Sequence, residues 1–150
     1  MVDRRGSNQF SRRLRLRAER FEANAQKMIQ DAALTALEIM ILGTPVDTAR
    51  ARSNWIVTND APAIGDIDPY YPYPKGSKGG GQGINERIDA TAALAAGMAV
   101  IDSFRIDVDV DLFITNNVRY LRYIPDGAIS SLSREAAEAA RNVLRTAKLL

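Results

Sequence analysis

The chain of 150 residues contains no cysteine and no histidine. These absences exclude disulfides, thiol nucleophiles, imidazole bases and any serine triad that depends on histidine. They also exclude zinc sites built from Cys or His. Carboxylate pairs such as Asp66 and Asp68 lie in a loop-like stretch with no partner base, whereas acid–base catalysis needs groups tuned by burial. We therefore expect no enzymatic activity, no metal and no cofactor.

Long hydrophobic runs are also missing. No segment approaches the roughly 18 apolar residues of a membrane span, and the start MVDRRGSNQF lacks the apolar centre of a signal peptide. The composition, 46% apolar and 25% charged, is usual for a soluble globular protein, and 150 residues suit one domain. We expect a single domain that is made in the host cytoplasm and has no membrane contact.

Positive charge is concentrated near the amino terminus. The net charge of the chain is only +2. Residues 1–30, one fifth of the chain, nevertheless hold eight basic and three acidic residues and so carry a net charge of +5. Such a segment can bind nucleic acid or an acidic protein surface, or it can be a solvated helix face. No helix-turn-helix, zinc or RNA-binding signature accompanies it. A DNA-binding protein that uses a basic amino-terminal helix stays open as an alternative.

A helical apolar stripe runs from Ser7 to Leu42, with Ser7 as a plausible N-cap. Gly43 suits a left-handed residue after the helix, and Pro45 cannot continue it. About 36 residues give roughly 54 Å of helix, which exceeds what a globule of this size needs. We expect residues 1–43 to form a long basic helix whose first turns project from the body. The arginines considered as interface candidates are Arg12, Arg13 and Arg17.

The stretch 59–84 is rich in proline and glycine and has little periodicity. Loops of this length are usually functional or disordered. Its tyrosines Tyr70, Tyr71 and Tyr73 stand among prolines, which favours a stiff, extended segment, and the glycine-rich half that follows is flexible. The sequence GSKGGGQG lacks the spacing of a phosphate loop. We interpret 59–84 as an arm that contacts another subunit, and a plain mobile loop is the alternative.

The remaining segments predict an α+β fold. A short strand at 54–58 precedes the arm, and a helix follows from Asn85 to Ser103, with one apolar side formed by Ile88, Ala92, Ala95 and Ala99 and widened by Leu94, Met98 and Ile101. Alternating apolar residues predict a strand over 106–116. A last helix is expected over 131–149. We therefore expect a small antiparallel sheet packed by the long first helix and the second helix, with a loop arm and a carboxy-terminal helix.

Three aspartates, Asp107, Asp109 and Asp111, alternate along the predicted strand. An EF-hand loop starting at Asp107 requires Gly at 112 and Glu at 118, but the chain has Leu112 and Val118. Residues two apart on a strand share a face, so the aspartates predict a solvated acidic ribbon.

Two short stretches carry specific patterns: TPVDTARARSNW over 44–55 and ITNNVRYLRYIPDG over 114–127. In the first, Asp47 can accept backbone N–H bonds in a turn, and Trp55 begins an apolar strand. In the second, Asn116 and Asn117 can adopt the tight conformations that end a strand. Each residue therefore has a purely structural interpretation. The positions that define the two patterns are Thr44, Pro45, Asp47, Arg50, Arg52, Trp55, Asn116, Asn117, Tyr120 and Gly127.

Together the stretches resemble the tail-completion or neck proteins of tailed bacteriophages, the connector subunits related to minor tail protein Z. In that family a long helix ends at T-P-V-D-T-G-x-x-R-x-x-W, and a later strand leads into I-T-N-N-x-x-Y-x-x-x-(L/I)-E-x-G. The family's later S-x-Q-A-P segment is missing here. The other departures are Ala49 for Gly, Arg119 for Pro, Arg122 and Tyr123 for smaller residues, and Asp126 for Glu.

The resemblance implies a virion protein at the junction of head and tail. Such a subunit forms a homo-oligomeric ring, sixfold or twelvefold, that lets DNA pass. In that ring the acidic ribbon of Asp107, Asp109 and Asp111 could face the central channel and keep DNA from sticking. Its partners are the portal, adaptor or head-closure proteins on one side and the tail terminator or tail tube on the other. A tail terminator subunit is the close alternative.

Overall fold

The computed structural model describes residues 4–44, 50–70, 84–108, 110–119, 121 and 127–147. The architecture is mixed α+β and mostly helical, with a two-stranded antiparallel sheet, as the sequence predicted. The elements in chain order are α1 (Arg4–Gly43), α2 (Arg50–Ser53), β1 (Ile56–Asn59), α3 (Ile84–Ser103), β2 (Leu112–Thr115) and α4 (Ala128–Thr146).

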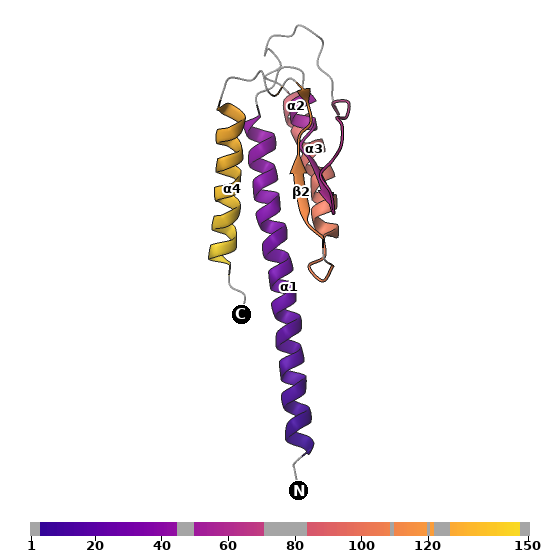
Figure 1. Ribbon diagram of the computed structural model, residues 1–150, viewed down its shortest axis with the longest axis vertical. Helices are drawn as coiled ribbons and strands as arrows, with labels where there is room; N and C mark the ends of the chain where they lie inside the picture. Colours follow the sequence, from indigo (N-terminus) through magenta and orange to yellow (C-terminus); the bar gives the residue numbers. More distant parts are fainter. Residues whose placement is uncertain are drawn as a thin grey trace.

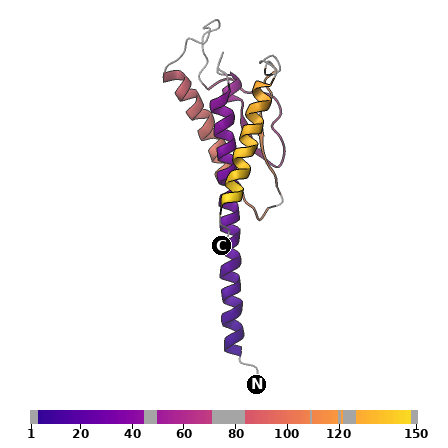
Figure 2. The same cartoon turned by 90° about the vertical axis from the view of Figure 1, so that its left-hand side faces the viewer.

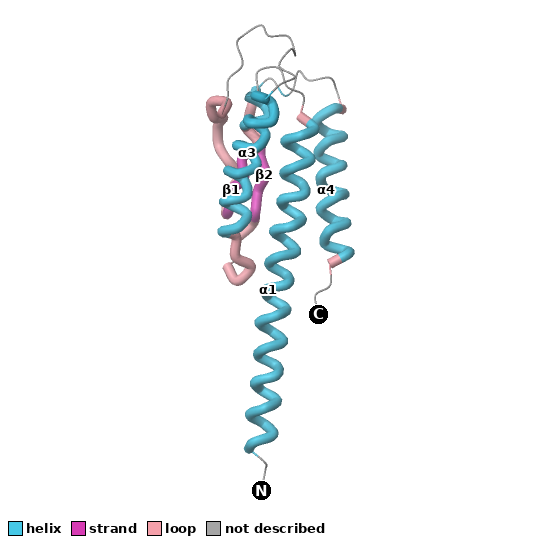
Figure 3. Tube along the Cα trace, turned by 180° about the vertical axis from the view of Figure 1, so that it is seen from behind, coloured by secondary structure: helices cyan, strands magenta, loops and turns pink. Residues whose placement is uncertain are grey.

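Helix α1 is the axis of the molecule. Its carboxy-terminal half lies between α4 on one side and the layer of α3 and the sheet on the other, whereas its amino-terminal half extends alone (Figures 1, 2 and 3). Every residue of 8–24 is exposed, and we call this segment the rod. The projection of the first turns, predicted from helix length, is confirmed. The helix begins at Arg4, so the predicted N-cap at Ser7 is wrong, because nothing between Arg4 and Ser7 interrupts the helical backbone.

The core gathers around the carboxy-terminal half of α1, where Leu37 and Ile41 are 0% exposed. Helix α3 approaches this core closely at Gly97. A Cβ atom at Gly97 would lie 2.3 Å from Cδ2 of Leu37 and 3.0 Å from Cγ2 of Val57. The glycine therefore allows α3 to pack against both α1 and β1. The other buried apolar residues of this cluster are Met40, Trp55, Ala90, Ala93, Ile101, Leu132 and Ala136.

Helix α4 packs against the opposite side of α1, and Leu132 meets Gly43 where α1 ends. A Cβ atom at Gly43 would lie 2.2 Å from Cδ1 of Leu132, so only glycine fits there without a shift. Gly43 is the last helical residue of α1, and the described glycines with positive φ are Gly65 and Gly127. The prediction of a left-handed Gly43 is therefore wrong: this glycine is required by close packing and not by backbone conformation.

The sheet pairs Ile56 with Thr115, Val57 with Ile114, Thr58 with Phe113 and Asn59 with Leu112. Leu112 and Ile114 pack against the core, as the alternating pattern predicted. The predicted strand over 106–116 is nevertheless too long, because Ile106, Asp107 and Val108 lie in a turn and bend. The last ladder-like bond runs from Asp60 N to Asp111 O at 2.9 Å, and Asp60 then turns away at φ 75°. In the described part of the chain, no strand pairs with Ile106–Val108 or Val110.

The other boundaries differ from prediction in smaller ways. Strand β1 begins at Ile56 and not at residue 54 as predicted, because Arg50–Ser53 forms a helical turn that the sequence did not suggest. Helix α4 spans Ala128–Thr146 instead of 131–149, and Ala147 is extended at φ −70° and ψ 139°. The predicted apolar side of α3 is partly wrong, since Ala95, Met98 and Ala99 are exposed. Over 90–103, where the burial of this helix is described, the buried residues are Ala90, Ala93, Gly97 and Ile101.

Candidate functional site

The first sequence pattern begins at a buried bond between Thr44 and Trp55. The indole Nε1 of Trp55 donates to Oγ1 of Thr44 at 2.7 Å, and the same hydroxyl donates to the Met40 carbonyl in the last turn of α1. Both side chains are buried. This chain of bonds fixes the end of α1 against the start of β1. Pro45 and Asp47, which belong to the same pattern, lie outside the described residues.

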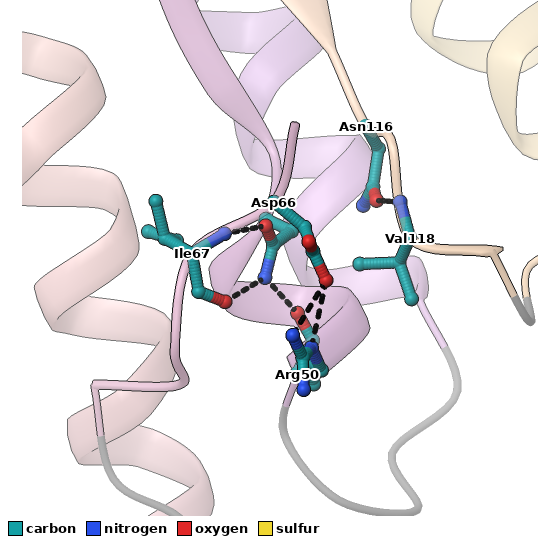
Figure 4. A network of polar contacts seen from close by, with 6 residues as sticks. Arg50, Asp66, Ile67, Asn116 and Val118 are labelled. Carbon is teal, nitrogen blue, oxygen red and sulfur yellow. Dashed lines mark hydrogen bonds and ion pairs between the residues drawn. The ribbon is translucent and has the colours of Figure 1, made fainter. Parts of the chain in front are cut away.

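The two arginines of the first pattern contact different neighbours. Arg52 donates from Nη2 to the Thr44 carbonyl at 3.3 Å. Arg50 forms an ion pair with Asp66, with 2.7 Å between Nη2 and Oδ2 and a second bond from Nε at 2.9 Å. Figure 4 shows the Asp66 carboxylate directed at the Arg50 guanidinium. Both partners are more than a third exposed, so solvent screening keeps this pair weak.

Asn54 is the central polar residue of this region, and the sequence analysis missed it. The side chain is fully buried. Its Nδ2 donates to the carbonyls of Arg50 at 2.7 Å and Ile67 at 2.8 Å, and its Oδ1 accepts from Ile67 N at 2.6 Å. Asn54 therefore fastens the loop at Ile67 to the turn of α2. Its partners at Ile67 lie 13 residues away, so no local pattern marks them.

The second sequence pattern reaches the same place from β2. Asn116 donates from Nδ2 to the Ala51 carbonyl at 2.7 Å and accepts at Oδ1 from Val118 N at 3.2 Å (Figure 4). Asn117 donates to the Ala63 carbonyl at 2.6 Å. The two patterns, 65 residues apart in sequence at Asn116 and Ala51, therefore meet. We call this region, defined by Thr44, Arg50, Asn54, Trp55 and Asn116, the motif junction.

Gly127, the last residue of the second pattern, precedes α4 with φ at 100°. Its carbonyl accepts from Ser131 N at 2.7 Å and from the Ser130 hydroxyl at 3.1 Å. Only glycine adopts this backbone conformation freely, so the position suits the change of direction into α4. Tyr120 lies outside the described residues.

The interface candidates fall on two surfaces. Arg12, Arg13 and Arg17 are exposed on the rod. The rod carries five arginines and two glutamates, which gives it a net charge of +3. Tyr70 is 40% exposed, and its backbone N–H donates to Oγ of Ser53 at 3.2 Å, which holds this end of the arm beside α2. Tyr71 and Tyr73 lie outside the described residues.

Two aspartates of the predicted ribbon, Asp107 and Asp111, border an open hollow of about 550 Å³ next to the start of β2. Asp107 pairs with Arg105, with 3.2 Å between Nε and Oδ1, and Asp111 is exposed. Asp109 lies outside the described residues. Because Asp107 and Asp111 are not in a strand, the predicted strand-face ribbon is wrong. The hollow is lined by Ile29, Phe104, Ile106, Asp107, Val108, Val110, Asp111 and Leu112.

Known proteins give no further identification. The chain matches no protein-family model, no curated protein and no solved structure. Within the part of the chain that the structure describes, no three acidic residues gather as metal ligands. None of the described helices combines the length and the apolarity that crossing a bilayer requires.

The geometry separates a structural region from two contact surfaces. In the motif junction the polar groups of Asn54, Asn116 and Thr44 bind backbone or neighbouring side chains, which fixes loops and leaves these groups little capacity for a ligand. The rod and the hollow, in contrast, expose apolar side chains next to charge. These two surfaces are the functional candidates.

Proposed function

We propose that the protein is a structural subunit of a tailed bacteriophage, which forms a ring at the head–tail junction, completes the neck and lets DNA pass. The proposal rests first on the resemblance of 44–55 and 114–127 to tail-completion proteins. The observation that carries it is the rod, in which 17 consecutive residues, 8–24, are all exposed.

A solitary protein gains little from such a segment. Most helical stability in proteins comes from packing of an apolar face, and the rod's apolar residues Phe10, Leu14 and Phe21 are at least 45% exposed. A neighbouring subunit that covers them supplies the missing packing. The rod therefore favours a protein whose native state is an assembly, which is the state of a connector subunit.

The meeting of the two patterns at the motif junction adds support. Bonds from Asn54 and Asn116 fix the loop at Ile67 and the end of β2 beside α2, at the end of the body opposite the rod (Figures 1 and 4). A rigid loop end of this kind suits contact with a second protein. In the proposed ring, this end of the molecule meets the head side or the tail side.

DNA binding through the rod is the second candidate, because five arginines are exposed there. It predicts duplex affinity that falls steeply with salt. It does not account for the exposed Phe10 and Phe21, which phosphates do not cover. A tail terminator subunit shares the resemblance and the assembly argument and is separated from a neck subunit by its neighbours.

The test is made in the virus that encodes the chain. Mass spectrometry of purified particles is expected to detect the protein, and disruption of its coding sequence is expected to leave filled heads and separate tails in electron micrographs. Wild-type particles that lack the protein would overturn the proposal. Native mass spectrometry with portal, adaptor and tail proteins identifies which neighbour it binds, and a neighbouring portal or tail-tube gene supports the same class.

A further inference from the structure

Three of the four large exposed apolar residues of the rod form one line, and the fourth, Leu16, lies on another side of the helix. Phe10, Leu14 and Phe21 are 63%, 50% and 45% exposed and are spaced by four and seven residues, so they share one side of the helix. Gly43 lies on the same side, 22 residues or about six turns after Phe21. There the line is covered, because Leu132 of α4 packs against Gly43. The rod thus continues an established packing surface beyond the point where α4 ends.

Positive charge borders this line on one side. Arg13, Arg17 and Arg20 are spaced by four and three residues and form a row next to the apolar line. The helical period places the two glutamates of the rod, Glu19 and Glu22, away from that row. The face made by the apolar line and the arginine row is therefore basic without any acidic residue, and we call it the rod face.

The hollow has the opposite character. Phe104, Ile106 and Val108 give it an apolar lining, with Ile106 and Val108 at least 36% exposed. Carboxylates border the hollow. Segment 102–112 holds four aspartates and one arginine, which gives the segment a net charge of −3. Gln30 of α1 supports this wall, because its Nε2 donates to the Ile101 carbonyl at 3.1 Å and the Asp102 carbonyl at 3.3 Å.

From this complementarity we infer that the rod face of one copy docks into the hollow of a neighbouring copy, apolar line against apolar lining and arginine row against Asp107 and Asp111. The contact joins two different surfaces, so each copy can give its rod to one neighbour and accept the rod of another. Such heterologous contacts generate rings when the rotation closes. The inference rests on the proposed function in one respect only: it identifies the contact through which the copies of the proposed ring associate.

Other occupants fit less well. A duplex matches the arginines but leaves Phe10 and Phe21 in water. A second rod laid with the same row against the first brings Arg13, Arg17 and Arg20 of both copies together, and like charges in contact oppose association. A small apolar ligand matches the hollow's volume of about 550 Å³ but leaves the rod face uncovered.

Because the chain has no cysteine, the contact can be tested by engineered disulfides. Val108→Cys is combined in turn with Phe10→Cys, Leu14→Cys and Phe21→Cys in the full chain, and the variants are oxidised both as purified protein and in assembled particles. We expect at least one pair to give a ladder of cross-linked oligomers on non-reducing gels. Arg12→Cys with Val108→Cys is the matched control, since Arg12 lies on the opposite side of the rod, and it is expected to give no ladder.

Charge reversal supplies an independent measurement. Arg13→Glu with Arg17→Glu, and separately Asp107→Arg with Asp111→Arg, are each expected to weaken self-association about tenfold or more, whereas a mixture of the two variants restores it. Arg12→Glu with Arg15→Glu makes the same charge change away from the rod face and is expected to have a much smaller effect. If the aspartate variant assembles as tightly as wild type, rods pair with rods and the inference is wrong.

The outcomes separate this inference from the proposed function. Particles that contain the protein but give no ladder with any rod-face pair overturn the inference and leave the neck function standing. A ladder from purified protein, together with particles that lack the chain, supports the contact and overturns the neck function. Binding of duplex DNA that is lost in the arginine variant, with no ladder in either sample, assigns the rod to nucleic acid instead.

Discussion

Trp55 and Thr44 are joined by a 2.7 Å hydrogen bond from the indole Nε1 to the threonine Oγ1, and both side chains are buried. The Thr44 hydroxyl in turn donates a hydrogen bond to the Met40 carbonyl. One hydroxyl therefore satisfies a donor on one side and an acceptor on the other. Removing it leaves two buried polar groups without this partner, which costs more than the loss of a single exposed bond.

Thr44→Val is expected to lower the free energy of unfolding by about 2–3 kcal/mol, because the Trp55 N–H loses its partner in a buried site. Thr146→Val is the matched control. Thr146 makes the same bond to the carbonyl four residues before it, at 2.9 Å, but is exposed. It should change stability by less than about 1 kcal/mol. Urea unfolding measures both, and equal losses would show that the Trp55 bond contributes nothing.

Asn54→Ala is expected to be among the most destabilising substitutions in the described chain, at about 3 kcal/mol or more. It removes three bonds in a fully buried site and frees the loop at Ile67. Asn117→Ala removes a single bond to the Ala63 carbonyl from an exposed residue and should cost about 1 kcal/mol. Chemical denaturation ranks the two; a smaller loss for Asn54→Ala would contradict the role given to it.

Gly97→Ala tests the close approach of α3. Alanine in a helix gains about 1 kcal/mol over glycine, but here the new Cβ lies 2.3 Å from Leu37 and overpacking costs about 1–3 kcal/mol. We expect a net loss of about 1 kcal/mol in the native background. In a Leu37→Ala background the 2.3 Å contact is gone and only the 3.0 Å contact with Cγ2 of Val57 remains, so the same substitution should stabilise slightly. The sign change is read from thermal unfolding, and stabilisation in both backgrounds would exclude the steric account.

Hydrogen exchange should vary along α1. The rod amides, over 8–24, are expected to exchange through local opening, because every residue of this segment is exposed. Amides near Leu37 and Ile41 should exchange only through global unfolding. Mass spectrometry of exchanging fragments measures the gradient. Uniform protection of α1 in a monomeric sample would mean that the rod is covered within one chain, contrary to the structure.

Sequence patterns predicted the fold class and the positions of the long helices well where a periodic apolar stripe was present. The helix over Asn85–Ser103 matches Ile84–Ser103, and the end of α1 near Gly43 is correct. The reason given for Gly43 was wrong, since Leu132 lies 89 residues away and cannot be inferred from local sequence. The predicted strand over 106–116 was too long for a similar reason. Alternation shows which residues can form a strand, but the length of the partner strand β1 decides how many residues pair.

The candidate site was predicted only in part. Thr44, Trp55 and Asn116 were selected from their patterns, and the structure brings them together. Asn54 and Asp66 were not selected as partners, because the bond to Ile67 and the ion pair with Arg50 join separate segments of the chain. The hollow was missed for the same reason, since Ile29 and Phe104 meet only after folding. Whether the rod face and the hollow are interfaces stays a prediction.

Because α1 runs unbroken from Arg4 to Gly43, it works as a stiff lever about 60 Å long whose short arm is embedded in the body. A change of 5° in how the body sits on a neighbour swings the far tip by roughly 5 Å, simply from that length. If the rod docks on a neighbouring copy as inferred above, a small rotation of one body is passed to the next copy as a displacement of several ångströms. Neighbouring copies in such an assembly would therefore be unable to tilt independently.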